Sequence, residues 1–170
     1  MLLTLFIFSC HQQPQLPSNR PQVDEEQENL ITLNKAIVSN EDKTIEQYIA
    51  KNKLSLKKDS LGFWCSVNVV GNSSQHKSKQ SVTYQYSIQL LDGRPCYSNL
   101  NSTKTTTILL GKGESFSGLD LALRKMKVGE QADFIFPSIL AYGVSGDRHR
   151  IPPYSSLVCT VKLLQCDNSK

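Results

Sequence analysis

The stretch LAYGVSGDRHRIPPYSSLV, residues 140–158, places a tyrosine on a glycine turn and then runs through a polar loop into Ile-Pro-Pro. Glycine after Tyr142 is the residue type that forms a tight turn most readily. Pro152 and Pro153 fix the backbone just before an apolar segment begins. The stretch therefore predicts a stiffened loop beside a strand.

Segments on both sides of this loop alternate apolar and polar residues with a period of two, which is typical of strands. The Asp-Gly pair after VTYQYSIQLL predicts a turn into a further strand, and TTTILL continues that strand after an irregular loop. The segments expected as strands lie within residues 63–70, 82–91, 91–98, 105–110, 131–137 and 156–166.

One helix is expected between these strands, in SGLDLALRKMKVGE, residues 117–130. Ser117 is the expected N-cap, and a glycine lies just past the expected end. Leu119, Leu123 and Met126 recur at helical spacing and should face inward. Antiparallel strands with a single helix predict an α+β domain, in which a curved antiparallel sheet wraps around one short helix.

The N-terminus begins with a short apolar stretch, MLLTLFIFSC. It is too short for a transmembrane helix, which needs about 20 residues, so we interpret residues 1–9 as a signal peptide. The junction with Cys10 resembles the lipobox of bacterial lipoproteins, which implies lipidation of Cys10. The alternative is a short buried N-terminal strand. Residues 10–23 are rich in Gln, Pro, Ser and Asn and are expected to form a flexible linker.

Residues 24–60 are expected to form an N-terminal helical extension made of two short amphipathic helices. The first carries an apolar stripe of Leu30, Leu33 and Ile37, and the second begins at Ser39 or Asn40 as N-cap. These stripes require a partner, which is either the other helix, the main domain or a second subunit. Self-association or partner docking through the helices is therefore one expectation. The main domain is assigned to residues 61–170.

Composition excludes several classes of function. The net charge of +4 comes from scattered Lys and Arg, so a nucleic-acid partner is not expected. Neither a phosphate-binding glycine motif nor a Cys/His cluster with zinc spacing is present in the sequence, so no cofactor or metal is expected. The remaining cysteines are expected either to be small apolar core residues or to form disulfides. They are Cys65, Cys96, Cys159 and Cys166.

Three blocks of the chain, residues 82–98, 109–134 and 140–164, resemble successive blocks of the FK506-binding-protein-type (FKBP) peptidyl-prolyl isomerases. Gly-Leu before the helix, Met-x-Val-Gly after it, and Ala-Tyr-Gly followed by Ile-Pro-Pro carry the resemblance. The N-terminal helices, the Cys10 junction and the GVSGD loop are most similar to the gliding-motility-associated lipoproteins of Bacteroidota, a branch of that family.

The resemblance implies that an apolar pocket accepts a prolyl ring, strips water from the imide and holds the chain in a turn near the twisted transition state. Tyr142 and the Phe116 N–H would bind substrate carbonyls, Tyr86 would form a wall, Leu119 the floor and Ile151 the lip. The implied catalytic residues are Tyr86, Phe116, Tyr142 and Ile151, and the implied substrate-binding residues are Cys96, Tyr97, Ser115, Leu119, Pro152 and Cys159.

Four wall positions depart from the family pattern. Cys96 and Cys159 stand where the family has Phe, Thr106 replaces a wall aromatic, and Tyr97 replaces an Asp that pairs with the wall tyrosine. The family's sheet order implies that the two wall cysteines are too far apart for a disulfide. Loss of apolar wall area leaves an alternative function, a non-catalytic binding or chaperone module in an envelope assembly for motility or secretion.

The expected partners follow from these assignments. They are proline-containing polypeptides as clients, and the outer or inner membrane through a lipid on Cys10. The expected location is the periplasmic face of a bacterial cell envelope, with the outer membrane favoured.

Overall fold

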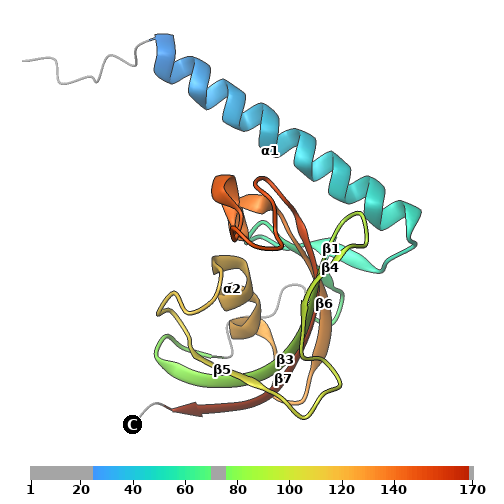
Figure 1. Cartoon of the computed structure of the whole chain (residues 1–170), viewed down its shortest axis with the longest axis vertical. Helices are drawn as coiled ribbons and strands as arrows, with labels where there is room; N and C mark the ends of the chain where they lie inside the picture. Colours follow the sequence, from blue (N-terminus) through green and yellow to red (C-terminus); the bar gives the residue numbers. More distant parts are fainter. Residues whose placement is uncertain (1–24, 70–75, 169–170) are drawn as a thin grey trace, which may run out of the picture.

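A strongly curved antiparallel sheet forms the body of the molecule in the computed structural model, which describes residues 25–69 and 76–168 (Figure 1). The sheet confirms the expected α+β architecture. Its strands are β1 (Leu56–Lys58), β2 (Trp64–Ser66), β3 (Gln80–Leu90), β4 (Pro95–Ser98), β5 (Thr106–Leu109), β6 (Gln131–Phe136) and β7 (Leu157–Asn168). The helical elements are α1 (Glu25–Lys51), α2 (Ser117–Lys125) and two short 3-10 turns, η1 (Ser138–Leu140) and η2 (Gly143–Ser145).

The strand order is β1-β2-β6-β7-β3-β4, and β5 pairs with β3 further along. β4 and β5 therefore lie on the same edge of β3, as expected for one strand interrupted by an irregular loop. Alternate residues of β3 and β7 point toward the concave face, so that Ile88 is opposite Cys159 and Tyr86 is opposite Val161. A register shift between Ile88 and Gln89 marks a bulge where β3 meets β4.

The concave face of the sheet wraps around α2, as Figure 1 shows. Leu119, Leu123 and Met126 are buried, as their spacing predicted. The prediction of Ser117 as N-cap was wrong, because Phe116 is the cap residue and α2 has no side-chain cap bond. The Ser117 hydroxyl instead donates to the Leu140 carbonyl oxygen at 3.2 Å, which ties the start of α2 to η1.

The first strand segment differs from the expectation. Of the described residues in the predicted segment 63–70, only Trp64–Ser66 form a strand, and the exposed Val67 lies in the turn that follows. β1 was not predicted, since residues 56–58 were assigned to the helical extension, yet they pair with β2. Three residues are too few to show a period of two, so the sequence pattern cannot reveal such a strand.

A single helix, α1, replaces the two helices that were predicted. Neither Gly nor Pro occurs between Glu25 and Lys51, so nothing breaks the helix at the expected caps Ser39 and Asn40. Its C-terminal part packs on the convex face of the sheet through the buried Ile45, whereas its N-terminal part extends past the domain (Figure 1). Leu30 there is exposed, and the side chains of Leu33 and Ile37 lie outside the described residues.

No helix within the described residues is long and apolar enough to span a membrane. The predictions for residues 1–9, Cys10 and the linker to residue 23 fall outside the described part of the chain.

Candidate functional site

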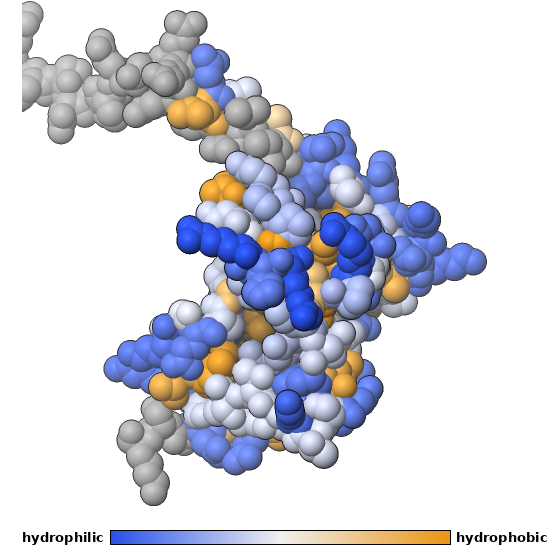
Figure 2. Space-filling view, in the orientation of Figure 1, coloured by the Kyte–Doolittle hydropathy of each residue, from blue (hydrophilic) through white to orange (hydrophobic). Residues whose placement is uncertain are grey.

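The structure brings most of the site residues predicted from sequence to one end of the concave face. They come from β3, β4, β7, the start of α2 and the loop between β6 and β7. Figure 2 shows the surface hollowed between the β6–β7 loop and the segment joining β5 to α2. The residues that meet in the same apolar cluster are Tyr86, Cys96, Tyr97, Phe116, Leu119, Tyr142, Ile151 and Cys159.

Two predicted substrate-binding residues lie at the margin of this cluster. Pro152 is exposed on the loop, next to the buried Ile151. Ser115 is half-buried, and its hydroxyl lies 3.3 Å from the carbonyl oxygen of Phe116. Both residues therefore border the cluster without packing in its centre.

Aromatic contacts hold one side of the site. The ring centroids of Phe116 and Tyr142 are 5.5 Å apart, and Phe116 meets Phe136 edge-on at 5.2 Å. Phe116 caps α2 at a position where helical N–H groups lack intrahelical acceptors. Among the described residues, no acceptor is bonded to the Phe116 N–H. This donor is therefore available beside the Tyr142 ring.

The Tyr142 hydroxyl remains protonated at neutral pH. Burial is the main cause that raises its pKa above the ordinary value for tyrosine, and the nearby Asp147 carboxylate raises it further. Tyr142 is only half-buried, so its hydroxyl is a hydrogen-bond donor at the edge of an apolar surface.

Asp147 organises the loop that carries Tyr142 and Ile151. Its Oδ1 accepts hydrogen bonds from the backbone N–H groups of His149 at 2.8 Å, Arg150 at 2.9 Å and Ile151 at 2.7 Å. Its Oδ2 accepts a 2.5 Å hydrogen bond from the Tyr97 hydroxyl of β4. We refer to these four bonds as the Asp147 clasp.

The electrostatics of the clasp favour its charged form. Burial raises the pKa of Asp147, but the hydrogen bonds from Tyr97 and from the loop N–H groups outweigh burial and lower the pKa to about 2. The same bond to Asp147, followed by desolvation, raises the pKa of Tyr97 to about 12. A neutral phenol therefore donates to a carboxylate anion throughout the neutral range.

Sequence reasoning missed Asp147, although a signal was present. An aspartate at the start of a polar turn characteristically accepts hydrogen bonds from backbone N–H groups a few residues later. Tyr97 occupies the position where the resemblance implied an aspartate, and here the acid comes from the facing loop.

Arg150 adds a second link between the loop and β4. Its guanidinium donates to the Cys96 carbonyl oxygen at 2.7 Å and lies 5.4 Å from the centroid of the Tyr97 ring. The Cys96 thiol in turn lies 3.8 Å from the Arg150 carbonyl oxygen. The loop is therefore tied to β4 by polar contacts on both strand residues, Cys96 and Tyr97.

The wall cysteines are buried free thiols. Cys96 lies on β4 and Cys159 on β7, on opposite sides of β3, so about two strand spacings of ~4.8 Å separate them, which is beyond disulfide reach. Burial raises the pKa of both thiols. The four cysteines of the described residues are free, and the burial of Cys65, Cys96 and Cys159 agrees with the prediction of small core residues, whereas Cys166 is only partly buried. No group of three metal-ligating side chains occurs in this part of the chain.

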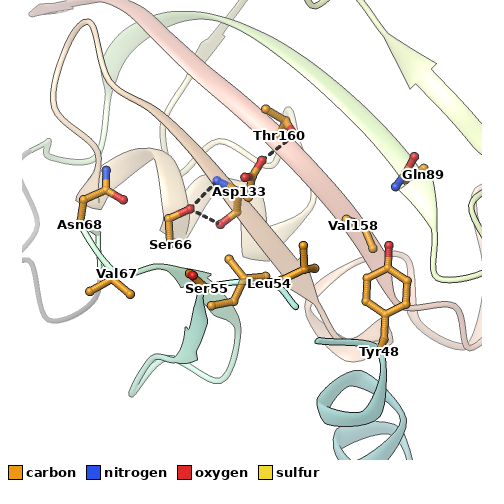
Figure 3. Close-up of a pocket in the computed structure, with 11 residues that line it drawn as sticks. Tyr48, Leu54, Ser55, Ser66, Val67, Asn68, Gln89, Asp133, Val158 and Thr160 are labelled. Atoms are coloured by element: carbon orange, nitrogen blue, oxygen red, sulfur yellow. Dashed lines mark hydrogen bonds between the residues drawn. The ribbon is translucent and has the colours of Figure 1, made fainter. Parts of the chain in front are cut away.

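A separate groove of about 470 Å³ lies on the opposite, convex face of the sheet (Figure 3). It is lined by Tyr48 of α1, by the α1–β1 segment including Leu54, and by outward residues of the sheet. Asp133 on its wall accepts a hydrogen bond from Thr160 at 2.6 Å and is bridged to Ser66 through its backbone. None of the predicted site residues lines this groove.

A curved sheet around one helix, with a tyrosine loop and an apolar cluster at one end, defines the FKBP class of folds, and comparison with known proteins agrees. The family model for FKBP-type peptidyl-prolyl cis-trans isomerases matches residues 72–164. The chain therefore belongs to the FKBP-type peptidyl-prolyl cis-trans isomerase family.

The chain matches a different share of each relative's own length. Peptidyl-prolyl cis-trans isomerase FKBP9 of Homo sapiens is 38% identical over 89 residues, which are 52% of this chain but only 16% of that protein. Peptidyl-prolyl cis-trans isomerase Fkbp12 of Drosophila melanogaster is 35% identical over 95 residues, 56% of this chain and 88% of that protein. The structure of FkpA from Escherichia coli superposes with a TM-score of 0.63 at 25% identity, covering 85% of this chain and 67% of that one.

Proposed function

We propose that this chain catalyses cis-trans isomerisation of Xaa-Pro bonds. The observation that carries the proposal is a pair of donors, the Phe116 N–H and the protonated Tyr142 hydroxyl, which lie beside one apolar cluster and have no acceptor among the described residues. A planar imide must lose resonance to rotate, against a barrier of ~18–20 kcal/mol, and neither an acid nor a base is needed to lower it.

The described residues divide this work. Ile151, Leu119 and the Phe116 ring are buried beneath the partly buried Tyr86 and Tyr142, and this apolar cluster would remove water from a prolyl ring and its imide. Tyr142 and the Phe116 N–H would hold the carbonyl oxygens on either side of the bond and so fix the chain in a turn. Because these contacts fit the twisted bond better than either planar form, they lower the barrier.

The cellular setting is proposed from sequence alone. The apolar stretch before Cys10 supports export and lipid attachment, and the GVSGD loop supports kinship with the gliding-motility lipoproteins. Clients would then be proline-containing exported proteins, met at the periplasmic side of a bacterial envelope membrane.

A second candidate function is a non-catalytic binding or chaperone module in an envelope assembly. The small Cys96 and Cys159 side chains favour it, because they contribute less apolar wall area than Phe would. The exposed Leu30 on the protruding part of α1 supports docking of a partner or of a second copy there. For this function, substitutions at Leu30, Leu33 and Ile37 would abolish partner recovery, whereas Tyr142→Phe would not.

The deciding experiment is an isomerisation assay by NMR exchange on a panel of Xaa-Pro peptides. Wild-type protein is expected to exceed the spontaneous rate. Tyr142→Phe removes one hydrogen bond to substrate, so kcat/KM should fall roughly fivefold. Ile151→Val removes one methylene, so kcat/KM should fall about threefold. Val128→Ala, an exposed change outside the site, is the control. A folded protein without acceleration would favour the binding module.

A further inference from the structure

One carboxylate of α1 reaches the loop that carries the candidate site residues. Glu41 Oε1 accepts hydrogen bonds from the Ser138 N–H at 2.7 Å and from the Ser156 hydroxyl at 2.5 Å. Its Oε2 accepts the Ser138 hydroxyl at 2.9 Å. Figure 1 shows α1 passing this loop, drawn in orange to red, before it reaches the sheet.

Ser138 and Ser156 stand at the two ends of the loop between β6 and β7. Tyr142 follows Ser138 by one short turn, and Ile151 precedes Ser156 in the Ile-Pro-Pro segment. Both serines are buried, at 5% and 6% exposure, and together with Glu41 they line a cavity of about 300 Å³. A single side chain from a distant part of the sequence therefore closes the base of the loop.

The helix itself is fixed to the sheet close to this contact. Ile45, one turn after Glu41, is fully buried against Trp64 and Ile135. Asp42 accepts an ion-pair bond from Lys58 of β1 at 2.5 Å. The position of Glu41 is therefore set by the convex face of the sheet, and the loop is held against that reference.

We propose that Glu41 is a positioning residue for the candidate site. Through this residue, α1 contributes to the activity of the isomerase domain. The inference rests on the proposed function. Through its three hydrogen bonds, Glu41 holds the loop so that Tyr142 and Ile151 stand at the distances that the turn-shaped substrate requires.

The kinetic test uses the full chain. Glu41→Ala should lower kcat/KM for an Xaa-Pro peptide about tenfold, mainly in kcat, because small displacements of binding groups cost up to ~10²-fold. Glu41→Gln should stay within about twofold of wild type, since its Oε1 still accepts and the Ser138 hydroxyl can accept from its amide. Glu46→Ala, an exposed glutamate of the same helix, is the matched control. Unchanged kinetics in Glu41→Ala, or equal losses in Glu41→Ala and Glu41→Gln, would overturn the inference.

A structural readout separates this inference from the proposed function. In ¹H–¹⁵N spectra, Glu41→Ala should shift the amide signals of Tyr142 and Ile151 and speed their hydrogen exchange, whereas Glu46→Ala should not. If wild-type protein lacks isomerase activity, the proposed function fails, but these signals still decide whether Glu41 positions the loop. Changes confined to Ser138 and Ser156 would refute the positioning role.

Discussion

Aromatic rings build one side of the candidate site, whereas hydrogen bonds build the other. Phe116 packs against Tyr142 and Phe136, and these contacts consist of overlapping apolar surface. On the β4 side, the small Cys96 stands where the resemblance implied a ring, and the loop is held by Tyr97 and Asp147 instead.

Because of this difference, substitutions on the two sides of the candidate site should weaken it in different ways. Apolar contacts are lost in proportion to the area removed, so the Phe116 side should weaken gradually. A backbone loop held through one carboxylate depends on that group for four bonds at once. Perturbing the clasp should therefore move Ile151, and with it the lip of the site, in a single step.

The largest effect is expected from Gly146→Ala, which breaks the loop side directly. Gly146 has φ 62° and ψ −167°, a region that is essentially restricted to glycine. A Cβ there would collide with the Ile151 carbonyl oxygen and lie 2.8 Å from the carbonyl carbon of Pro152. We expect kcat/KM to fall about 100-fold, with about 1–3 kcal/mol of lost stability, measured by NMR exchange and urea unfolding.

Gly93→Ala is the matched control for this change. Gly93 also has a positive φ, 86°, but a Cβ there meets nothing within 4 Å. It should share the conformational strain without displacing the loop. Equal losses of activity in both variants would show that the β6–β7 loop has no special role.

Asp147→Ala should have the next largest effect, a fall in kcat/KM of about tenfold. It removes the acceptor of three loop N–H groups and of the Tyr97 hydroxyl together. Asp147→Asn keeps Oδ1 for the N–H groups, so its loss should be about threefold. Steady-state kinetics on one peptide would compare the two. A smaller loss in the alanine variant would contradict the clasp.

Much of the fold could be predicted from sequence, because alternation and helical spacing are local signals. The buried Leu119, Leu123 and Met126 follow directly from that spacing. Local signals also explain the errors. Ser39 and Asn40 have the chemistry of helix caps, but the packing of α1 on the sheet keeps the helix continuous through them.

The candidate site was predictable where the family blocks align with the chain, including at departures such as Cys96 and Cys159. Tyr142, Phe116 and Ile151 could be placed by their motifs, whereas Asp147 and Glu41 could not. Their partners lie 50 residues away at Tyr97 and 97 residues away at Ser138, and periodicity does not connect such distant segments. The contacts that hold this loop are therefore a property of the tertiary structure.

Tyr97→Phe tests the hydrogen-bonded side of the site with a smaller change. We expect about a twofold fall in kcat/KM. It removes one of the four bonds of the clasp, while the three backbone bonds to Asp147 remain and keep Ile151 in place. The same peptide assay measures it, with Tyr154→Phe, an exposed tyrosine of the loop, as control. A tenfold loss would mean that Tyr97 contacts substrate directly.

The smallest effect is expected from pH: between about pH 5 and 9 the hydrogen bonds of the Asp147 clasp should not change. The pKa of Asp147 is lowered to about 2, so the stabilisation from its charge is fully present above the ordinary carboxyl pKa of ~3.9 and is lost as pH falls toward 2. The pKa of Tyr97 is raised to about 12, so the stabilisation from its neutral form is fully present below the ordinary value of ~10 and is lost as the pH rises toward 12. The amide signal of Ile151, followed by NMR on a His149→Gln background to remove the adjacent imidazole, should therefore stay constant between about pH 5 and 9 and move only below about pH 4. Adding Asp147→Asn should abolish the acidic inflection.

An inflection within the neutral window would show that a different titrating group controls the loop. The two sides of the site would then not differ in the way that the hydrogen bonds of the Asp147 clasp indicate.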